Sequence, residues 1–214
     1  ATAGAVPVQG AARRQPTLPA LASFPVDPAK RERLLSGQAR HRLPNQLPIA
    51  HLNPYETDYV YTEIFGDRCY MKHGITLRPG DTVIDIGANI GLFSLFVQQE
   101  APGAYIYAFE PSPPAFRALQ CNAELYLPNA KVFNWGIAEA AQSATFTFYQ
   151  NSSVFSSFHA EAEADRTAIR TVVENMVRKG QKSTLGPADL ASIVDELMVG
   201  RMASQTLTCQ LYAL

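Results

Sequence analysis

One short segment constrains the fold more than any other part of the chain. The sequence DTVIDIGANIGLFSLFV occupies residues 81–97 and follows a proline-glycine turn signal. Residues 82–86 form an apolar run that ends at Gly87, which is typical of a buried strand in a parallel sheet. The pattern then predicts a helix over about residues 90–100. A strand, a glycine turn and a helix in this order indicate a parallel α/β unit.

The alternation of strands and helices continues beyond this segment. Apolar runs predict strands over residues 104–109 and 130–137, with an amphipathic helix over residues 113–125 between them. Residues 144–149 alternate apolar and polar side chains, as in a strand nearer the edge of a sheet. We therefore expect an α/β protein with a doubly wound, Rossmann-like parallel sheet.

The glycine turn has the geometry of a ligand site. A glycine after a buried strand permits a sharp turn, and the free amides of the following helix attract a carboxylate or another anion. Gly87 and Gly91 fit this pattern, but the middle glycine of the dinucleotide fingerprint G-x-G-x-x-G is missing. Asp85 and Asn89 add hydrogen-bonding groups that suit an amino acid moiety.

Polar residues also follow the next two predicted strands. Glu110 ends the second strand, where an acidic residue can accept both hydroxyl protons of a ribose. The alternative for Glu110 is a carboxylate that stabilises the N-terminus of the helix after Pro111. Asn134 and Gly136 end the third strand and are expected near an adenine ring. The pairing of Gly87 with Glu110 is the sharpest of these signals.

Composition and charge limit the partners. The chain has 214 residues and a formal net charge of -1, so no basic face is available to neutralise nucleic-acid phosphates. Its three cysteines form no CxxC pattern, which disfavours a disulfide framework or a zinc site, and no metal is expected. There is no apolar run of about 20 residues and no secretory signal pattern. We expect a cytoplasmic protein with neither a nucleic-acid nor a membrane partner.

Several segments together resemble a known family. Between about residues 53 and 149 the chain contains NPYETDYVYTEIF, YMKHGI, DTVIDIGANIGLFSLF, YAFEPSPPAF and NWGIAE. In combination they resemble the FkbM-type S-adenosylmethionine-dependent methyltransferases, especially O-methyltransferase domains embedded in modular polyketide synthases. The resemblance implies S-adenosylmethionine as the cofactor, with the methionine, ribose and adenine parts at the three strand ends described above. The expected cofactor-binding residues are Asp85, Gly87, Ala88, Asn89, Gly91, Glu110, Pro111, Asn134 and Gly136.

The same resemblance, with the composition, predicts four regions. Residues 1–45 are expected to be a linker and docking arm, and residues 46–159 the cofactor-binding core with the first half of the sheet. Residues 160–204 are charged and helical in period, and they resemble the lid insertion of synthase-embedded members. Residues 205–214 are expected to start a further core strand. Family members continue with an acidic strand motif that is not found here, so we expect a truncated sheet.

Methyl transfer to oxygen requires a base beside the acceptor hydroxyl. His73 is the leading candidate because the resemblance brings YMKHG toward the cofactor crevice, and Glu63 is expected to orient it. His159, at the start of the predicted lid, and His51 are the second candidates, whereas His41 looks like part of the linker. The alternatives are a turn histidine at position 73 and a solvent-facing helical carboxylate at position 63.

The resulting functional expectation is an enzyme that methylates a hydroxyl of an acyl chain held by an acyl carrier protein, with neighbouring synthase domains as partners. This substrate follows from the resemblance alone. One alternative is a non-catalytic module that keeps the strand-turn-helix unit without its chemistry. A nicotinamide-dependent oxidoreductase is a third hypothesis, which the missing glycine argues against.

Overall fold

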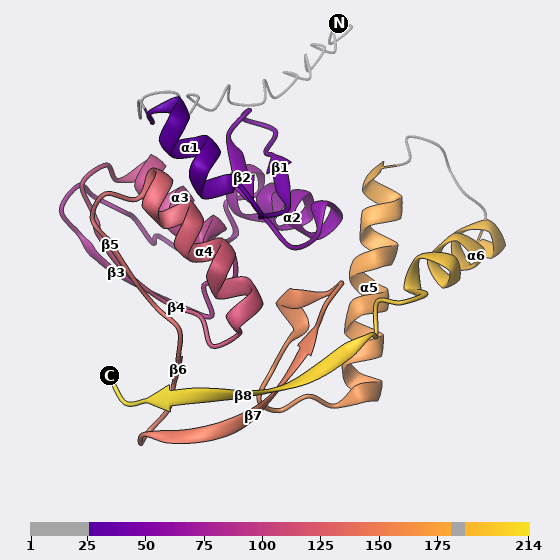
Figure 1. Ribbon diagram of the computed structural model, residues 1–214. Helices are drawn as coiled ribbons and strands as arrows, with labels where there is room; N and C mark the ends of the chain where they lie inside the picture. Colours follow the sequence, from indigo (N-terminus) through magenta and orange to yellow (C-terminus); the bar gives the residue numbers. More distant parts are fainter. Residues whose placement is uncertain (1–25, 181–186) are drawn as a thin grey trace, which may run out of the picture.

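A computed structural model describes residues 26–180 and 187–214. Its centre is a three-stranded parallel sheet in the order β3-β4-β5, formed by Thr82–Ile86, Tyr105–Phe109 and Ala130–Phe133 (Figure 1). Two helices, α3 (Leu92–Glu100) and α4 (Pro113–Tyr126), connect these strands. The predicted alternation of parallel strands and helices is therefore confirmed, and it places all three strand ends at one edge of the sheet.

The two faces of this sheet differ. Helices α3 and α4 pack against one face, and Leu95, Phe96 and Val97 of α3 are fully buried there. On the other face, Ile84 and Ile86 are 51% and 59% exposed, among the residues that the structure describes. Parallel sheets are usually covered on both faces, so this apolar face is the less typical part of a Rossmann-like fold.

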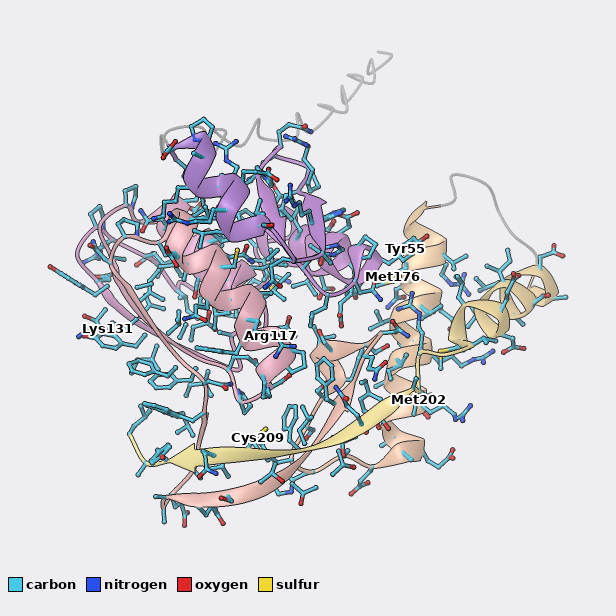
Figure 2. All side chains as sticks on the ribbon, in the orientation of Figure 1. Tyr55, Arg117, Lys131, Met176, Met202 and Cys209 are labelled. Atoms are coloured by element: carbon cyan, nitrogen blue, oxygen red, sulfur yellow. The ribbon has the colours of Figure 1, made fainter. Side chains whose placement is uncertain are left out.

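A second sheet lies beside the first and holds the C-terminal strand. Its order is β6-β8-β7, formed by Gly136–Ile137, Ser204–Tyr212 and Gln142–Tyr149, with β8 antiparallel to β7 and parallel to β6. The strand expected over residues 205–214 is present as β8, which ends at Tyr212 and pairs in this second sheet instead of the central one. Its small core contains Phe146, Phe148 and Cys209, the last of which is labelled on β8 in Figure 2.

The predicted strand over residues 130–137 is wrong as a single element. It is divided into β5 and β6, which belong to different sheets. Between them, the Asn134 side-chain amide donates to the backbone carbonyls of Glu110 and Pro111, at 2.9 and 3.2 Å. An aromatic cluster then bridges the two sheets, since the centroid of the Trp135 ring lies 4.8 Å from that of Phe133 and 4.9 Å from that of Tyr212.

The N-terminal elements pack on the core. They are α1 (Pro28–Leu35), β1 (Arg40–Arg42), β2 (Pro48–Ala50), α2 (Pro54–Tyr61), the π-helical turn η2 (Thr62–Gly66) and the 3-10 turn η3 (Cys69–Met71). Residues 26–45 of the expected linker and docking arm are therefore folded onto the core, and residues 1–25 lie outside the described part. The reason is burial, because Leu35 and Leu43 are 3% and 0% exposed. The Lys30 ammonium also donates to the Glu124 carbonyl of α4 at 3.0 Å.

Residues 160–204 form a helical pair, as predicted. Helices α5 (Ala162–Gly180) and α6 (Pro187–Met198) share a small apolar cluster that includes Ile169, Val173 and Val194. The short 3-10 turn η4 (Ser153–Phe155) precedes them, and Figure 1 shows the pair standing to one side of the central sheet. Across the described ranges, every helix is too short or too polar to cross a lipid bilayer.

Candidate active site

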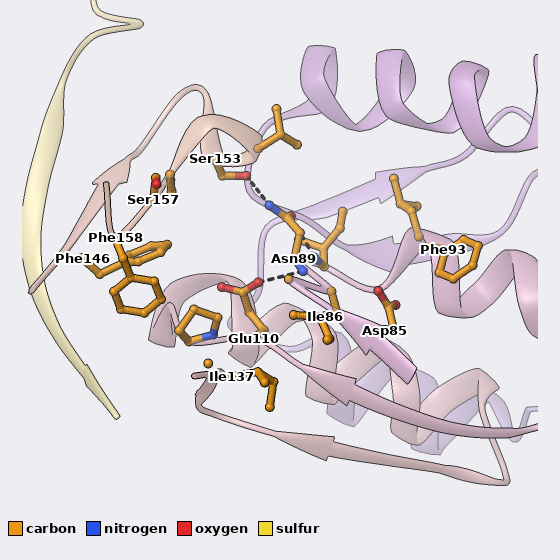
Figure 3. A pocket seen from close by; sticks show the side chains of 18 of the residues that line it. Asp85, Ile86, Asn89, Phe93, Glu110, Ile137, Phe146, Ser153, Ser157 and Phe158 are labelled. Carbon is orange, nitrogen blue, oxygen red and sulfur yellow. Dashed lines mark hydrogen bonds between the residues drawn. The ribbon is translucent and has the colours of Figure 1, made fainter. Parts of the chain in front are cut away.

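A cavity of about 1190 Å³ opens at the carboxyl ends of β3 and β4. Its floor is the turn between β3 and α3, and its walls come from α2, from β6 and β7, and from η4 with the residues that follow it (Figure 3). This is the edge at which open α/β sheets bind their ligands. The volume exceeds the range of about 300–1,000 Å³ that is typical of small-molecule pockets, so it is large enough for a cofactor together with an acceptor.

The glycine turn is built from backbone hydrogen bonds. The N–H groups of Gly87 and Ala88 both donate to the Phe109 carbonyl of β4, at 2.9 and 3.0 Å. Gly87 has a φ of +74° and Asn89 a φ of +50°, so the chain passes through the left-handed region, which glycine and asparagine tolerate best. These bonds fix the turn against β4, and the side of the turn away from β4 faces the cavity.

Gly91 supports the turn from behind and does not line the cavity. Its φ is +89°, and a Cβ atom at this position would lie 2.8 Å from Leu119 Cδ1 on α4. The glycine therefore permits α3 to begin at Leu92 in close contact with α4. Its expected role in binding the methionine end of the cofactor stays a prediction, whereas its packing role follows from the geometry.

Asn122 of α4 fixes the same turn to the N-terminal segment. Its side-chain amide donates to the carbonyls of Ala50 and Ile90, at 2.9 and 2.8 Å, and its oxygen accepts from the Ala50 N–H at 2.8 Å. Asn122 is fully buried. Without it, the Ala50 N–H and the two carbonyls would be buried without a partner, so this side chain fixes β2 to the glycine turn.

Glu110 lies where the sequence predicts a ribose-binding carboxylate. One carboxylate oxygen accepts from the Asn89 backbone N–H and the other from the Ser112 N–H, both at 2.8 Å. The side chain is only 5% exposed, and burial raises the pKa of Glu110 to about 7, although the two N–H groups favour the charged form. Each oxygen keeps a lone pair for a further donor.

Asp85 reaches the cavity from the end of β3. The Ser94 hydroxyl of α3 donates to its carboxylate at 2.6 Å, and burial raises the pKa of Asp85 above its ordinary value. Ala88, Asn89 and Pro111 line the same part of the cavity. The structure thus brings together most of the predicted cofactor set.

The predicted adenine end is more mixed. Asn134 is exposed and does not line the cavity, because its amide is bonded to the backbone after β4. Gly136 does line it, and a Cβ atom there would lie 2.6 Å from Leu211 Cδ2 and 3.2 Å from the Phe158 ring. Ile137 and Phe158 face the cavity beside Glu110 (Figure 3). They provide an apolar wall next to the predicted ribose carboxylate.

The predicted general base, His73, and the residue expected to orient it, Glu63, both lie outside the cavity lining. His73 is exposed in a turn with a φ of +60°, and Glu63 of η2 accepts a hydrogen bond from the Tyr59 hydroxyl. Burial and this bond raise the pKa of Tyr59 to about 12. Neither His73 nor Glu63 lines the cavity, so their catalytic roles stay predictions.

Within the described chain, His159 is the one histidine that lines the cavity. Its backbone N–H donates to the Ser157 hydroxyl at 2.9 Å, and its side chain is exposed. His51 is 8% exposed, and burial lowers its pKa. Its ring packs at 5.2 Å from His41, which is bonded to Asp58 at 2.6 Å and is therefore part of the fold rather than a linker residue.

The sequence did not indicate the role of Glu56. This carboxylate is 7% exposed, lines the cavity and accepts from the Ser153 hydroxyl and the Val154 N–H, both at 2.8 Å. Its sequence context, Asn53 followed three residues later by glutamate, is typical of a helix cap, and the Asn53 side chain does accept from the Glu56 N–H. This local pattern does not indicate the long-range contacts of Glu56 with Ser153 and Val154.

Comparison with known proteins gives a consistent assignment, although no family model matches the chain. The chain is 44% identical over 131 residues to the 31-O-demethyl-FK506 methyltransferase FkbM of Streptomyces tacrolimicus, covering 61% of this chain and 50% of that protein. It is 40% identical over 171 residues to the AMB antimetabolite synthetase AmbE of Pseudomonas aeruginosa, covering 79% of this chain and 8% of that protein. Methyltransferase sdnD of Sordaria araneosa is 34% identical over 109 residues, covering 50% of this chain and 41% of sdnD.

The chain thus spans half or less of the length of these relatives. The structure of this chain has a parallel sheet, a glycine turn and an acidic residue at the end of the second strand of that sheet, as its resemblance to methyltransferases predicts. The resemblance predicted from the sequence is confirmed, and this chain is a homologue of the FkbM-type methyltransferases with a Rossmann-like methyltransferase fold.

Proposed function

We propose that this protein is an S-adenosylmethionine-dependent O-methyltransferase. The observation that carries the proposal is the buried Glu110 carboxylate, which is held by two backbone N–H groups directly beside the glycine turn. Two ribose hydroxyls would donate to the free lone pairs of this carboxylate. A nicotinamide cofactor is disfavoured, because the turn has neither the glycine spacing nor the pyrophosphate cradle of that class.

The residues around Glu110 fit the rest of this cofactor. Asp85 and the turn at Gly87 and Asn89 offer acceptors and donors to an amino acid group, and Ile137 and Phe158 offer an apolar surface to a flat ring. When bound, the cofactor supplies an electrophilic methyl group on a sulfonium. A Phe93 ring on α3 and Leu52 before α2 contribute apolar surface to the same cavity. Such a lining excludes water from the reacting groups.

The acceptor must be positioned in line with the methyl group, and its hydroxyl proton must be taken up by a base. Of the predicted bases, His159 is favoured by its place on the cavity wall and its exposed side chain. It would accept the hydroxyl proton and release it to solvent. His73, with Glu63, remains the alternative predicted from the sequence.

The acceptor class rests on the relatives. One relative is named for an oxygen of FK506, and another is a synthetase. We therefore propose that the acceptor is a hydroxyl of an acyl chain on a carrier protein, with neighbouring synthase domains as partners. The free Cys69, Cys121 and Cys209 are in keeping with a cytoplasmic setting.

Calorimetric titration of the full-length protein with S-adenosylmethionine tests the proposal. We expect saturable binding, and then transfer of labelled methyl to a hydroxyacyl N-acetylcysteamine thioester. Binding without transfer to any hydroxyl acceptor would favour a non-catalytic module, and absence of binding would refute the cofactor assignment. A parallel titration with NADH, followed by its absorbance, is expected to show no binding.

A further inference from the structure

A chain of hydrogen bonds crosses the cavity from α2 to the cofactor turn. The Ser153 hydroxyl donates to a carboxylate oxygen of Glu56 at 2.8 Å, and the Asn89 side-chain amide donates to that same hydroxyl at 2.9 Å. The Asn89 backbone N–H in turn donates to Glu110. Figure 3 shows the two bonds of Asn89 as dashed lines, one reaching Ser153 and the other Glu110.

The direction of each bond is fixed by chemistry. An ionised carboxylate only accepts, so the Ser153 proton must point toward Glu56, and the lone pairs of the hydroxyl are then free to accept from Asn89. Glu56 and Ser153 are 7% and 5% exposed, which means that water competes little for these groups. Burial raises the pKa of Glu56, while its two donors favour the charged form.

The partners come from three separate parts of the chain. Glu56 and Ser153 are 97 residues apart, and Asn89 and Ser153 are 64 apart. Glu56 lies in α2, Ser153 begins η4, and Asn89 is the left-handed residue of the cofactor turn. All three line the cavity, so the bonds set the distance between the predicted cofactor floor and the opposite wall.

Burying the Glu56 carboxylate costs free energy. If this side chain had no function at the cavity, an apolar residue would be favoured in its place. Replacing a buried charge and its partners by apolar groups is often neutral or stabilising. The fold also has a second link between the same segments, because the Asn53 side chain donates to the Asn151 carbonyl at 3.2 Å. Glu56 is therefore not needed merely to attach η4 to α2.

We propose that Glu56 is a positioning residue, which acts through Ser153 and Asn89 to hold the acceptor-side wall of the cavity in register with the cofactor turn. The proposal rests on the proposed methyltransferase function. In-line transfer depends on the distance between acceptor and methyl group, and a displacement of about 1 Å lowers turnover by about 10²-fold. Glu56 would not touch either reactant.

The test compares three variants of the full-length protein. Glu56→Gln keeps the size of the side chain but replaces one acceptor oxygen by an amide donor, so Ser153 loses its acceptor or Val154 meets a second donor. Ser153→Ala removes the middle of the chain of bonds and leaves Glu56 in place. Glu124→Gln, at an exposed position of α4, is the matched control.

Three quantities are measured: the Kd for S-adenosylmethionine, the turnover of the thioester, and the amide hydrogen exchange of residues 152–156 with and without S-adenosylhomocysteine. For Glu56→Gln and Ser153→Ala we expect turnover to fall about 10²-fold while Kd changes less than about threefold, since Glu110 keeps both backbone donors. We also expect the cofactor-induced protection of residues 152–156 to be lost. The control should keep the wild-type values.

The outcomes separate the two proposals. If the wild-type protein binds no S-adenosylmethionine, the proposed function fails before the variants are considered. If it binds, and both variants keep turnover and cofactor-induced protection like Glu124→Gln, the positioning role of Glu56 is overturned. A loss of turnover that merely parallels a loss of folded protein in thermal melting would also overturn it.

Discussion

Two buried carboxylates face the same cavity, and they are held in different ways. Glu110 accepts from backbone N–H groups that lie 21 and 2 residues away along the chain. Glu56 accepts from groups that lie 97 and 98 residues away. The predicted cofactor edge, which consists of the glycine turn at Gly87 and the Glu110 carboxylate, is thus built by one strand-turn-helix unit and its neighbouring strand. The opposite wall forms only when distant segments of the chain meet.

The difference has a consequence for rigidity. At the cofactor edge, the Gly87 and Ala88 N–H groups are tied to β4, so the turn is fixed by the sheet itself. At the opposite wall, side chains, chiefly those of Glu56 and Asn53, join α2 to η4 and the residues before it, whereas backbone bonds between Thr147 and Ser157 tie this segment to β7. A contact made by side chains opens more easily than a turn that is bonded through its backbone to a sheet. The wall is therefore the part that we expect to move when an acceptor enters.

The largest effect on turnover is expected from removal of the general base. The same experiment shows whether His159 or His73 is that base. His159→Ala should lower turnover about 10²-fold or more while leaving the Kd for S-adenosylmethionine unchanged, since a general base contributes about 10²–10⁴-fold. His73→Ala is measured in the same assay. A larger loss for His73→Ala would move the base away from the cavity wall and restore the prediction made from the sequence.

Removal of the cofactor-edge carboxylate should have the next largest effect. Glu110→Ala deletes the acceptor for two hydroxyl donors, each worth about 1.5–3 kcal/mol when the acceptor is charged. We expect the Kd to rise more than about tenfold, as measured by calorimetry. An unchanged Kd would refute the ribose assignment, and Glu56→Gln provides the contrast because it removes a carboxylate from the other wall.

The same comparison explains what could be predicted from the sequence. The strand-turn-helix unit and Glu110 were predictable because apolar period, glycine position and strand ends are local signals, and parallel strands bring their ends together. Glu56 was not, since an asparagine followed three residues later by a glutamate is the local pattern of a helix cap and does not indicate a partner 97 residues away. Its partner Ser153 lies in a segment without a distinctive pattern.

Two features of the fold were not predicted, for similar reasons. Residues 130–137 look like one apolar strand, but the side-chain bonds of Asn134 to the Glu110 and Pro111 carbonyls turn the chain into a second sheet. Residues 26–45 were expected to belong to a linker and docking arm, and their sparse apolar residues do not show how closely they pack on the core. The burial of Leu35 and Leu43 depends on contacts with the core, such as those of α1 with α4, which no local period reports.

A substitution at Gly91 tests whether the predicted cofactor edge depends on the backbone conformation and close packing of the glycine turn. Gly91→Ala must place a Cβ atom 2.8 Å from Leu119 and keep a φ of +89°. Backbone strain of this kind costs about 1–3 kcal/mol, so the free energy of unfolding should fall by about that amount in urea denaturation. A control substitution, Gly103→Ala, has a φ of +91° without a close neighbour. An equal loss at both positions would show that strain alone, and not the contact with Leu119, matters.

The pH dependence of binding tests the electrostatics of the same edge. Burial raises the pKa of Glu110 from its ordinary value of 4.5 to about 7, and the Asp85 carboxylate adds to the rise. The protonated Glu110 side chain therefore contributes to the stability of the cofactor-free protein. This contribution is complete below pH 4.5 and is lost as the pH rises through 7.

Cofactor binding should show the opposite trend, because ribose hydroxyls donate to the charged carboxylate. We expect affinity to rise with pH and to reach its plateau above about pH 7. If the carboxylate is fully charged in the complex, affinity at pH 6 should be about tenfold weaker than on the plateau. Calorimetry in buffers of different ionisation enthalpy would detect release of the Glu110 proton on binding. The Glu110→Gln variant serves as the control, and an equal pH dependence in that variant would assign the effect to another group.

The smallest effect, a local loss of stability, is expected at the far end of the opposite wall, where β7 contacts α5. The Tyr149 hydroxyl donates to the Asp165 carboxylate at 2.8 Å, and burial together with Asp165 raises the pKa of Tyr149 to about 12. Tyr149→Phe removes this bond and keeps the ring, so it should lower stability by about 1 kcal/mol. The loss should be local, since α5 has its own cluster with α6. Faster amide exchange in the first turn of α5, with unchanged exchange in β3 and β4, would bear out the contrast between the two sides of the cavity. Equal acceleration on both sides would show that the wall and the cofactor edge unfold together, and the comparison between them would fail.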